Sequence, residues 1–198
     1  MTDFITLAGA GTGEYTEKRS VFLGYAMPVD TEEAAISFVK EIRKKHADAR
    51  HNVYAYRIGA NLTRYSDDGE PSGTAGMPVL DLLRHGEITN AVLVVTRYFG
   101  GTLLGTGGLV RAYTAAGKAA LESAGTRLVR EMVTCVVRCP YGDFARIADA
   151  CQNFEAQAAE PIFAEDVTLT LTMPATRKEV FTAWLVDFSL GRIAPVWK

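Results

Sequence analysis

One glycine-rich segment near the middle of the chain constrains the fold most, because it joins a strand-like run to a helix-like run. Arg97–Arg111 reads RYFGGTLLGTGGLVR. Before it, Ala91–Thr96 is short, apolar and β-branched, as in a buried strand, and after it Leu109–Leu121 is rich in alanine and lacks proline. We therefore predict a strand-to-helix junction where glycine allows a tight turn and close approach by another molecule. The first N–H groups of such a helix are free to bind an anion.

A second segment of the same character precedes it. Ser66–Pro78 reads SDDGEPSGTAGMP and runs into an apolar stretch that begins at Val79. Thr74 is a candidate helix cap, and Pro78 suits a first helical turn. Glycine content alone fits tight turns without any ligand. The arginines that flank the later loop, Arg97 and Arg111, favour a phosphate or carboxylate ligand.

The residues predicted to bind an anion or a nucleic acid lie in or beside these two loops. They are Arg64, Ser72, Gly73, Thr74, Arg97, Gly100, Gly101, Thr106, Gly107, Gly108 and Arg111. Aromatic residues lie among them, and single-stranded RNA is held by such mixtures, because cations contact phosphates and aromatic faces stack on bases. The alternative is that the rings, those of Tyr65, Tyr98, Phe99 and Tyr113, fill the core.

Together the loops resemble the signature of the YigZ/IMPACT family, whose N-terminal domain is of the UPF0029 type. The matching stretches are SDDGEPSGTAG at 66–76 and RYFGGTLLGTGGLVRAY at 97–113. DARHNVYA at 48–55 resembles the family's strand entry, whereas KRSVFLG at 18–24 is a looser version of its basic element. The resemblance implies a role in translational control. In eukaryotic relatives that role runs through a partner protein that activates an initiation-factor kinase.

The pattern of elements predicts an α+β chain of two domains, at 1–126 and 127–198. The resemblance implies a ribosomal-protein-S5 domain-2-like fold for the first domain and a ferredoxin-like fold for the second, both similar to the last two domains of elongation factor G. Within the first domain we expect a helix over 32–46, capped by Asp30 and Glu33, and a helix that ends near Gly125. The second reads strand, helix, strand, strand, helix, strand, the ferredoxin-like order. A capping box of Thr176 and Glu179 is expected to begin its last helix.

Clustered acidic residues in the first loop suggest an alternative function. Asp67, Asp68 and Glu70 suit either a solvated turn or a Mg²⁺ site that bridges to a bound phosphate. Mg²⁺ is the one cofactor considered, and only for an enzyme, since without a nucleophile beside a base hydrolysis would need a metal to activate water. No catalytic residue is predicted. The glycine spacing of a P-loop is present, but Thr106 stands where the phosphate-binding lysine belongs.

Composition limits the class of partner. The net charge of −2 and pI near 5.9 argue against a globally basic nucleic-acid binder, so RNA would have to meet a local patch. The first residues lack the pattern of a signal peptide and no apolar run is long enough to span a bilayer, which predicts a cytoplasmic protein with no membrane partner. The three cysteines are interpreted as core residues.

The sequence as a whole predicts a non-enzymatic protein linked to translation. It would bind RNA, the ribosome or a translation-regulatory protein through a basic cleft formed by the two glycine loops. The alternative is a metal-dependent, hydrolase-type enzyme acting on a phosphorylated or carboxylated small molecule. The sequence makes no prediction of the oligomeric state.

Overall fold

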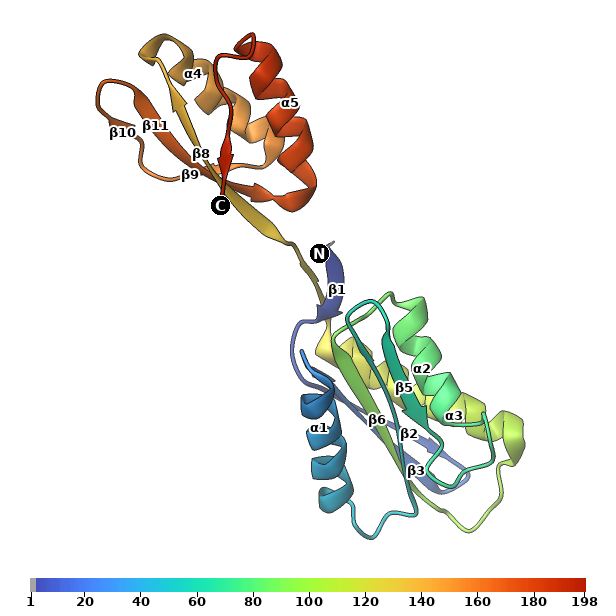
Figure 1. Cartoon of the computed structure of the whole chain (residues 1–198). Coiled ribbons are helices and arrows are strands. Elements are labelled where there is room, and N and C mark those ends of the chain that lie inside the picture. The colour runs from blue at the N-terminus through green and yellow to red at the C-terminus, as the bar shows by residue number, and fades with distance from the viewer. Residues whose placement is uncertain (1–2) are drawn as a thin grey trace. The chain divides into compact units, whose positions relative to one another are not determined.

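A computed structural model describes residues 3–198, which form two compact units that divide between Val129 and Arg130 (Figure 1). The α+β class and the two-unit organisation expected from the sequence are confirmed. The division falls later than the expected 126/127 boundary, because β7 (Thr126–Val129) pairs antiparallel with β1 (Phe4–Leu7) and so completes the first unit.

The first unit is built on a five-stranded antiparallel sheet in the order β2-β3-β6-β4-β5. Its central strand, β6, is almost entirely buried, as its apolar sequence requires. The strands span Gly11–Glu17 (β2), Ser20–Pro28 (β3), His51–Ile58 (β4), Leu62–Ser66 (β5) and Ala91–Tyr98 (β6).

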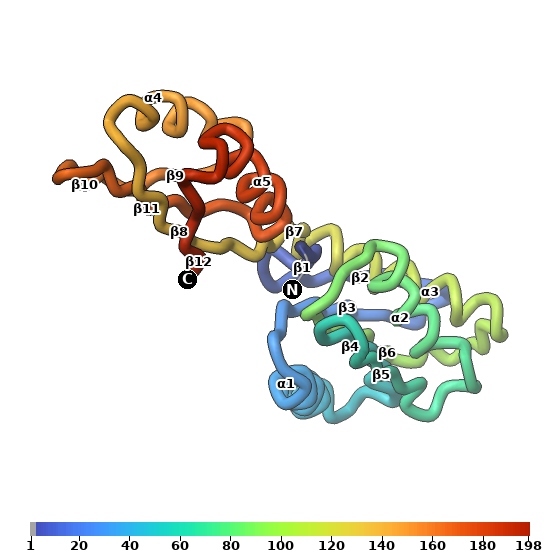
Figure 2. The backbone as a smooth tube through the Cα atoms, turned by 45° about the horizontal axis from the view of Figure 1, so that its top comes forward, coloured from blue at the N-terminus to red at the C-terminus, as the bar shows by residue number. Residues whose placement is uncertain are grey.

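Helices cover both faces of this sheet. α1 (Glu32–Lys45) packs on one face, where Val39 and Ile42 meet the β6 residue Val92. α2 (Gly76–His85) and α3 (Gly105–Ala124) lie together on the other face (Figures 1 and 2). α3 packs closely on β3, since a Cβ at Gly24 would sit 2.4 Å from the carbonyl oxygen of Ala116. The two faces of the sheet are therefore separate environments, and a side chain on one does not reach the other.

The ends of the helices agree in part with those predicted from the sequence. α3 ends at Ala124, as predicted, and Gly125 follows it with φ 64°, a positive value that favours glycine. The expected cap of α1 by Asp30 and Glu33 is wrong, because Thr31 is the N-cap and its hydroxyl accepts the N–H of Ala34 at 3.2 Å.

The second unit has the strand and helix order expected from its sequence except that the second expected strand is divided into two short ones, β9 and β10. Its elements are β8 (Met132–Cys139), α4 (Tyr141–Ala150), β9 (Gln157–Ala158), β10 (Ile162–Phe163), β11 (Val167–Pro174), α5 (Lys178–Phe188) and β12 (Val196–Trp197), with short 3₁₀ turns at Cys151–Phe154 and Ala175–Arg177. The sheet runs β10-β11-β8-β12, and β9 also pairs with β11. The predicted capping box before α5 is not formed, because the 3₁₀ turn leads directly into the helix and no side chain caps it.

The cysteines lie where the sequence placed them, in the core of the second unit. Cys135, Cys139 and Cys151 are buried and free. Burial raises the pKa of the Cys135 thiol to about 11, as expected of a packing residue rather than a reactive one. Among the helices described, none is long and apolar enough to cross a membrane.

Candidate functional site

The N-terminus of α3 is open. Leu104 is its N-cap and offers no side-chain acceptor, and the first turn carries no acidic residue. Gly105, Thr106 and Gly107 in that turn are exposed. A helix start of this kind presents free N–H groups and the positive end of the helix dipole, so the later glycine loop forms the open helix start that the sequence predicted.

The N-terminus of α2 is closed by the chain itself. The Asp67 carboxylate accepts the N–H groups of Gly73, Ala75 and Gly76 at 3.0, 3.1 and 2.7 Å. The predicted cap Thr74 does not act as one, since its hydroxyl donates to the carbonyl of Pro71. Ser72, Gly73 and Thr74 were expected to bind an external anion, but an internal anion already holds this helix start.

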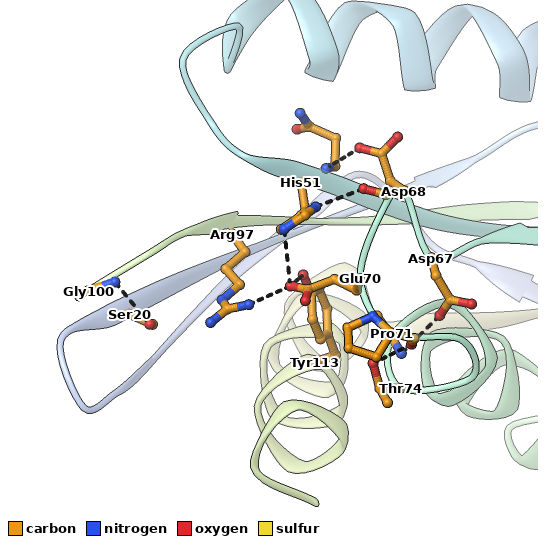
Figure 3. A network of polar contacts seen from close by, with 12 residues as sticks. Ser20, His51, Asp67, Asp68, Glu70, Pro71, Thr74, Arg97, Gly100 and Tyr113 are labelled. Atoms are coloured by element: carbon orange, nitrogen blue, oxygen red, sulfur yellow. Dashed lines mark hydrogen bonds and ion pairs between the residues drawn. The ribbon is translucent and has the colours of Figure 1, made fainter. Parts of the chain in front are cut away.

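A buried ion pair lies beside the open helix start (Figure 3). Glu70 accepts from Arg97 Nη1 at 2.6 Å and from the Tyr113 hydroxyl at 2.7 Å. Its side chain is 3% exposed and that of Arg97 is 7% exposed. Burial, reinforced by the adjacent Glu70 carboxylate, raises the pKa of Tyr113, so this hydroxyl stays protonated and donates.

Arg97 keeps hydrogen-bonding capacity after pairing with Glu70. Its guanidinium carbon lies 5.6 Å from the centre of the Phe22 ring and 5.5 Å from that of Phe99. Its Nε–H is buried and has no hydrogen-bond partner among the residues described. A guanidinium offers five donors, so donors remain for a further acceptor.

His51 joins the same group, although the sequence did not single it out as a site residue. It faces Arg97 in the register of β4 and β6. Its Nδ1 lies 2.7 Å from the carbonyl oxygen of Asp68, which can only accept, so Nδ1 carries the hydrogen. In the neutral ring Nε2 is therefore an acceptor, and it lies 3.8 Å from Glu70 Oε1.

These groups line a cavity of about 430 Å³. Arg97 and His51 come from the sheet, Glu70 and Pro71 from the first loop, and Gly105 and Thr106 from the start of α3. The exposed side chains of Phe99 and Leu103 form an apolar wall of the cavity, and Arg50 adds a positive charge to its lining. We call this cavity the α3 pocket.

Further cations surround the glycine loop. The tight turn between β2 and β3 consists of Lys18 and Arg19, both with positive φ. This turn lies against Gly100, whose N–H donates to Ser20 Oγ at 3.0 Å and whose Cβ, if present, would sit 2.1 Å from the carbonyl carbon of Arg19. Gly100 is therefore a close-packing glycine.

The remaining glycines of the second loop have different roles. Gly101 is exposed with φ 84°, which favours glycine. Gly108 is buried, and a Cβ there would lie 2.9 Å from that of Leu104. A Cβ at Gly107 would lie 3.6 Å from Arg111 Nη1, so the Arg111 side chain reaches back to the start of α3.

Other predicted residues lie elsewhere. Arg64 on β5 pairs in register with Tyr56, whose side chain packs in the core under α1, so Arg64 is on the opposite face of the sheet from the α3 pocket. Tyr98 also points to that face, where its hydroxyl contacts His46. Tyr113 is fully buried, and of the four aromatic residues proposed to stack on bases, Phe99 lines the pocket.

The predicted Mg²⁺ cluster is not formed. Asp67 caps α2, and Glu70 pairs with Arg97. Asp68 accepts from the N–H of Asn52 at 2.7 Å and from Arg43 at 2.6 Å. Over the described residues, no group of three or more histidine, cysteine, aspartate and glutamate side chains is placed to hold a metal ion. The expectation for Asp67, Asp68 and Glu70 is thus corrected: each carboxylate has its own internal partners.

Comparison with known proteins identifies two domain families in this chain. Residues 18–121 match the Impact N-terminal domain family, and residues 137–192 match a domain of unknown function, DUF1949. The IMPACT family member YvyE of Bacillus subtilis is 34% identical over 96% of this chain and 88% of its own length. The IMPACT family member YigZ of Escherichia coli is 36% identical over 89% of this chain and 88% of its own.

A solved structure supports the same assignment. The crystal structure of a hypothetical protein with 33% sequence identity superposes with a TM-score of 0.65, covering 99% of this chain and 97% of the other. The rat protein named Protein IMPACT is 38% identical, over 46% of this chain and 30% of its own length. The chain therefore belongs to the IMPACT family, with an Impact N-terminal domain followed by a DUF1949 domain.

Proposed function

We propose that this protein is a non-enzymatic, translation-associated protein of the cytoplasm whose first unit binds RNA through the α3 pocket. One observation carries the proposal. Of two similar loop-to-helix junctions, that of α2 is filled by Asp67, whereas that of α3 is open and faces the buried Arg97. An open helix start beside an arginine is a site for phosphate.

The charges near the pocket suit a polyanion despite the negative net charge. Glu70 offsets one of the positive charges, that of Arg97. Lys18, Arg19, Arg50 and Arg111 are exposed. The turn that holds Lys18 and Arg19 lies against Gly100, and Arg111 Nη1 lies near Gly107. A local patch of this kind supplies phosphate contacts that do not depend on base sequence.

The link to translation comes from the family. The resemblance noted in the sequence implies translational control, and we extend it to RNA of the ribosome, to free RNA or to a translational regulator as the natural partner. We also assign the S5 domain-2-like fold to the first unit and the ferredoxin-like fold to the second. The second assignment draws on the strand order β12-β8-β11-β10.

A salt series tests the proposal. Binding of a generic single-stranded RNA is measured by fluorescence anisotropy for the wild type, Arg19→Ala and Arg111→Ala. Each variant should weaken binding and reduce the slope of log K against log salt by about 0.7, the value for one phosphate contact on a single strand. These side chains are exposed, so folding should be unaffected.

Arg64→Ala is the matched control. It removes the same charge from the opposite face of the sheet and should leave the slope unchanged. Equal effects of all three substitutions would mean that RNA responds to total charge and not to this pocket. Undetectable RNA binding by the wild type at low salt would refute the proposal.

A further inference from the structure

The α3 pocket has the size of a site for one nucleotide, not of a groove for a strand. Its volume of about 430 Å³ lies in the range of small-molecule sites, about 300 to 1,000 Å³. Proteins that hold single strands without sequence preference use grooves that follow about 4 to 16 nucleotides. The pocket is therefore suited to a single unit of a nucleic acid.

The pocket ends at buried groups. Glu70 and Arg97 lie at its inner wall with side chains 3% and 7% exposed, between the sheet and α3. A polynucleotide cannot continue past this wall, because the sheet is behind it. A group that reaches Arg97 must belong to the end of a ligand.

The donors at the pocket match a terminal phosphate. The first turn of α3 is exposed, and its residues Gly105 and Thr106, with free N–H groups, line the pocket. The Arg97 side chain lines the cavity and has a buried Nε–H without a partner in the described part of the chain. A phosphate monoester has three terminal oxygens and a charge of about −1.5 to −2. An internal diester has fewer free oxygens and less charge, so it uses fewer of these donors.

The remaining walls match a nucleoside. Phe99 is 43% exposed and lines the cavity, and bases stack on aromatic side chains. His51 also lines the cavity and adds a polar ring to the wall beside Glu70.

We propose that the α3 pocket binds a nucleotide phosphomonoester, with the phosphate on the first turn of α3 and Arg97 and the base against Phe99. The ligand is a phosphorylated RNA end or a free mononucleotide. This inference rests on the proposed function, because it names the ligand of the same pocket.

Three RNAs of one sequence test the inference, one with a 5′-phosphate, one with a 3′-phosphate and one with hydroxyls at both ends. All carry the same internal fluorophore, and affinities are measured at one salt concentration. One phosphorylated form should bind at least about tenfold more tightly than the hydroxyl form, the factor for one charge-assisted hydrogen bond. The mononucleotide with the same phosphate position should compete.

A substitution pair at Thr106 isolates the backbone donor. Thr106→Pro removes one N–H of the first turn, where proline is tolerated, and should abolish the preference for the phosphorylated end. Thr106→Ala keeps that N–H and should retain the preference. Thermal melting followed by circular dichroism confirms that both variants are folded.

The outcomes separate this inference from the proposed function. Competition by a mononucleotide without any preference among RNA ends supports the pocket and identifies free nucleotide as its ligand. Equal binding of the three RNAs without competition overturns the inference, while a salt slope that still depends on Arg19 and Arg111 preserves the proposed function. If no RNA binds at low salt, both fail.

Discussion

At the scale of single residues, the group around Glu70 explains how the chain buries a charge next to the α3 pocket. A carboxylate with 3% side-chain exposure is costly unless it is paired and hydrogen-bonded. Arg97 and Tyr113 both donate to Oε1, and each comes from a different element. The group therefore joins β6, α3 and the first loop at one atom.

Tyr113→Phe should destabilise the first unit while leaving its fold intact. It removes one donor from a buried carboxylate, and hydrogen bonds to charged groups contribute about 1.5 to 3 kcal/mol. Urea unfolding measures the loss. Tyr15→Phe is the control, because its hydroxyl donates to Glu17 at 3.1 Å in a less buried place, and its effect should be smaller. Equal losses would contradict the role assigned to Glu70.

His46 should make stability depend on pH. Its Nδ1 and Nε2 contact the hydroxyls of Tyr98 and Tyr25 at 2.9 and 2.7 Å. Burial, and secondarily the charge of Lys45, lowers its pKa below the ordinary 6.5. The folded state thus takes up a proton less readily than the unfolded state, so the contribution is complete above pH 6.5 and is lost as pH falls through the lower folded value.

Urea unfolding of the wild type and of His46→Gln, measured between about pH 8 and pH 5, tests this pH dependence. These pH values lie on both sides of the ordinary histidine pKa of about 6.5. The wild type should lose stability on acidification, and the variant should lose less. His85→Gln, at the exposed end of α2, is the control and should retain the wild-type slope. The assignment would be wrong if His46→Gln and the wild type had the same pH profile.

At the scale of elements, Asp67 is the cap of α2 even though it lies outside the helix. Asp67→Ala should lower the free energy of unfolding by about 0.5 to 2 kcal/mol, as for loss of an N-cap. Asp67→Asn should lower the free energy of unfolding by less, because the amide oxygen still accepts hydrogen bonds from the N–H groups of the helix start. Asp81→Ala, which removes an exposed acid paired with Arg84 on the same helix, should have little effect.

A magnesium titration distinguishes this cap from a metal ligand. If Asp67 acts as a cap, Mg²⁺ should leave the melting temperature of the wild type unchanged. A rise in melting temperature that Asp67→Asn abolishes would instead support the metal alternative.

Sequence reasoning succeeded where the signal is local. The apolar run of β6, the glycine loop before α3 and the stop at Gly125 each depend on neighbouring residues. It failed where partners are distant in the chain. The pairing of His51 with Arg97 depends on strand register, which the sequence around either residue does not specify.

The candidate site likewise combines local and distant contacts. The loop sequence around Arg97 predicts a helix start with free N–H groups beside an arginine, and the structure has both. The sequence could not predict that Asp67 would occupy the start of α2 and leave the start of α3 open, because the loop can fold back on its own helix in several ways. The face on which Arg64 lies likewise follows from register rather than from its position near the loop.

At the scale of the whole molecule, the boundary at 129/130 predicts how fragments behave. A fragment of residues 1–129 should melt cooperatively and at a higher temperature than residues 1–126, because the shorter one lacks most of β7, the strand that pairs with β1 along its whole length. Residues 130–198 should fold as well, with the low stability expected of a small domain. Identical melting temperatures for residues 1–129 and residues 1–126 would show that the pairing of β1 with β7 adds nothing to the stability of the first unit.

The pairing of β1 with β7 also orders events during synthesis. β1 is the first strand of its unit to be synthesised, and its antiparallel neighbour is the last strand of the same unit. A nascent chain that has already assembled its five-stranded sheet and α3 still holds β1 without that neighbour. Completion of the first unit therefore waits until the chain is extended to Val129, and translation passes directly from that closing strand into the second unit.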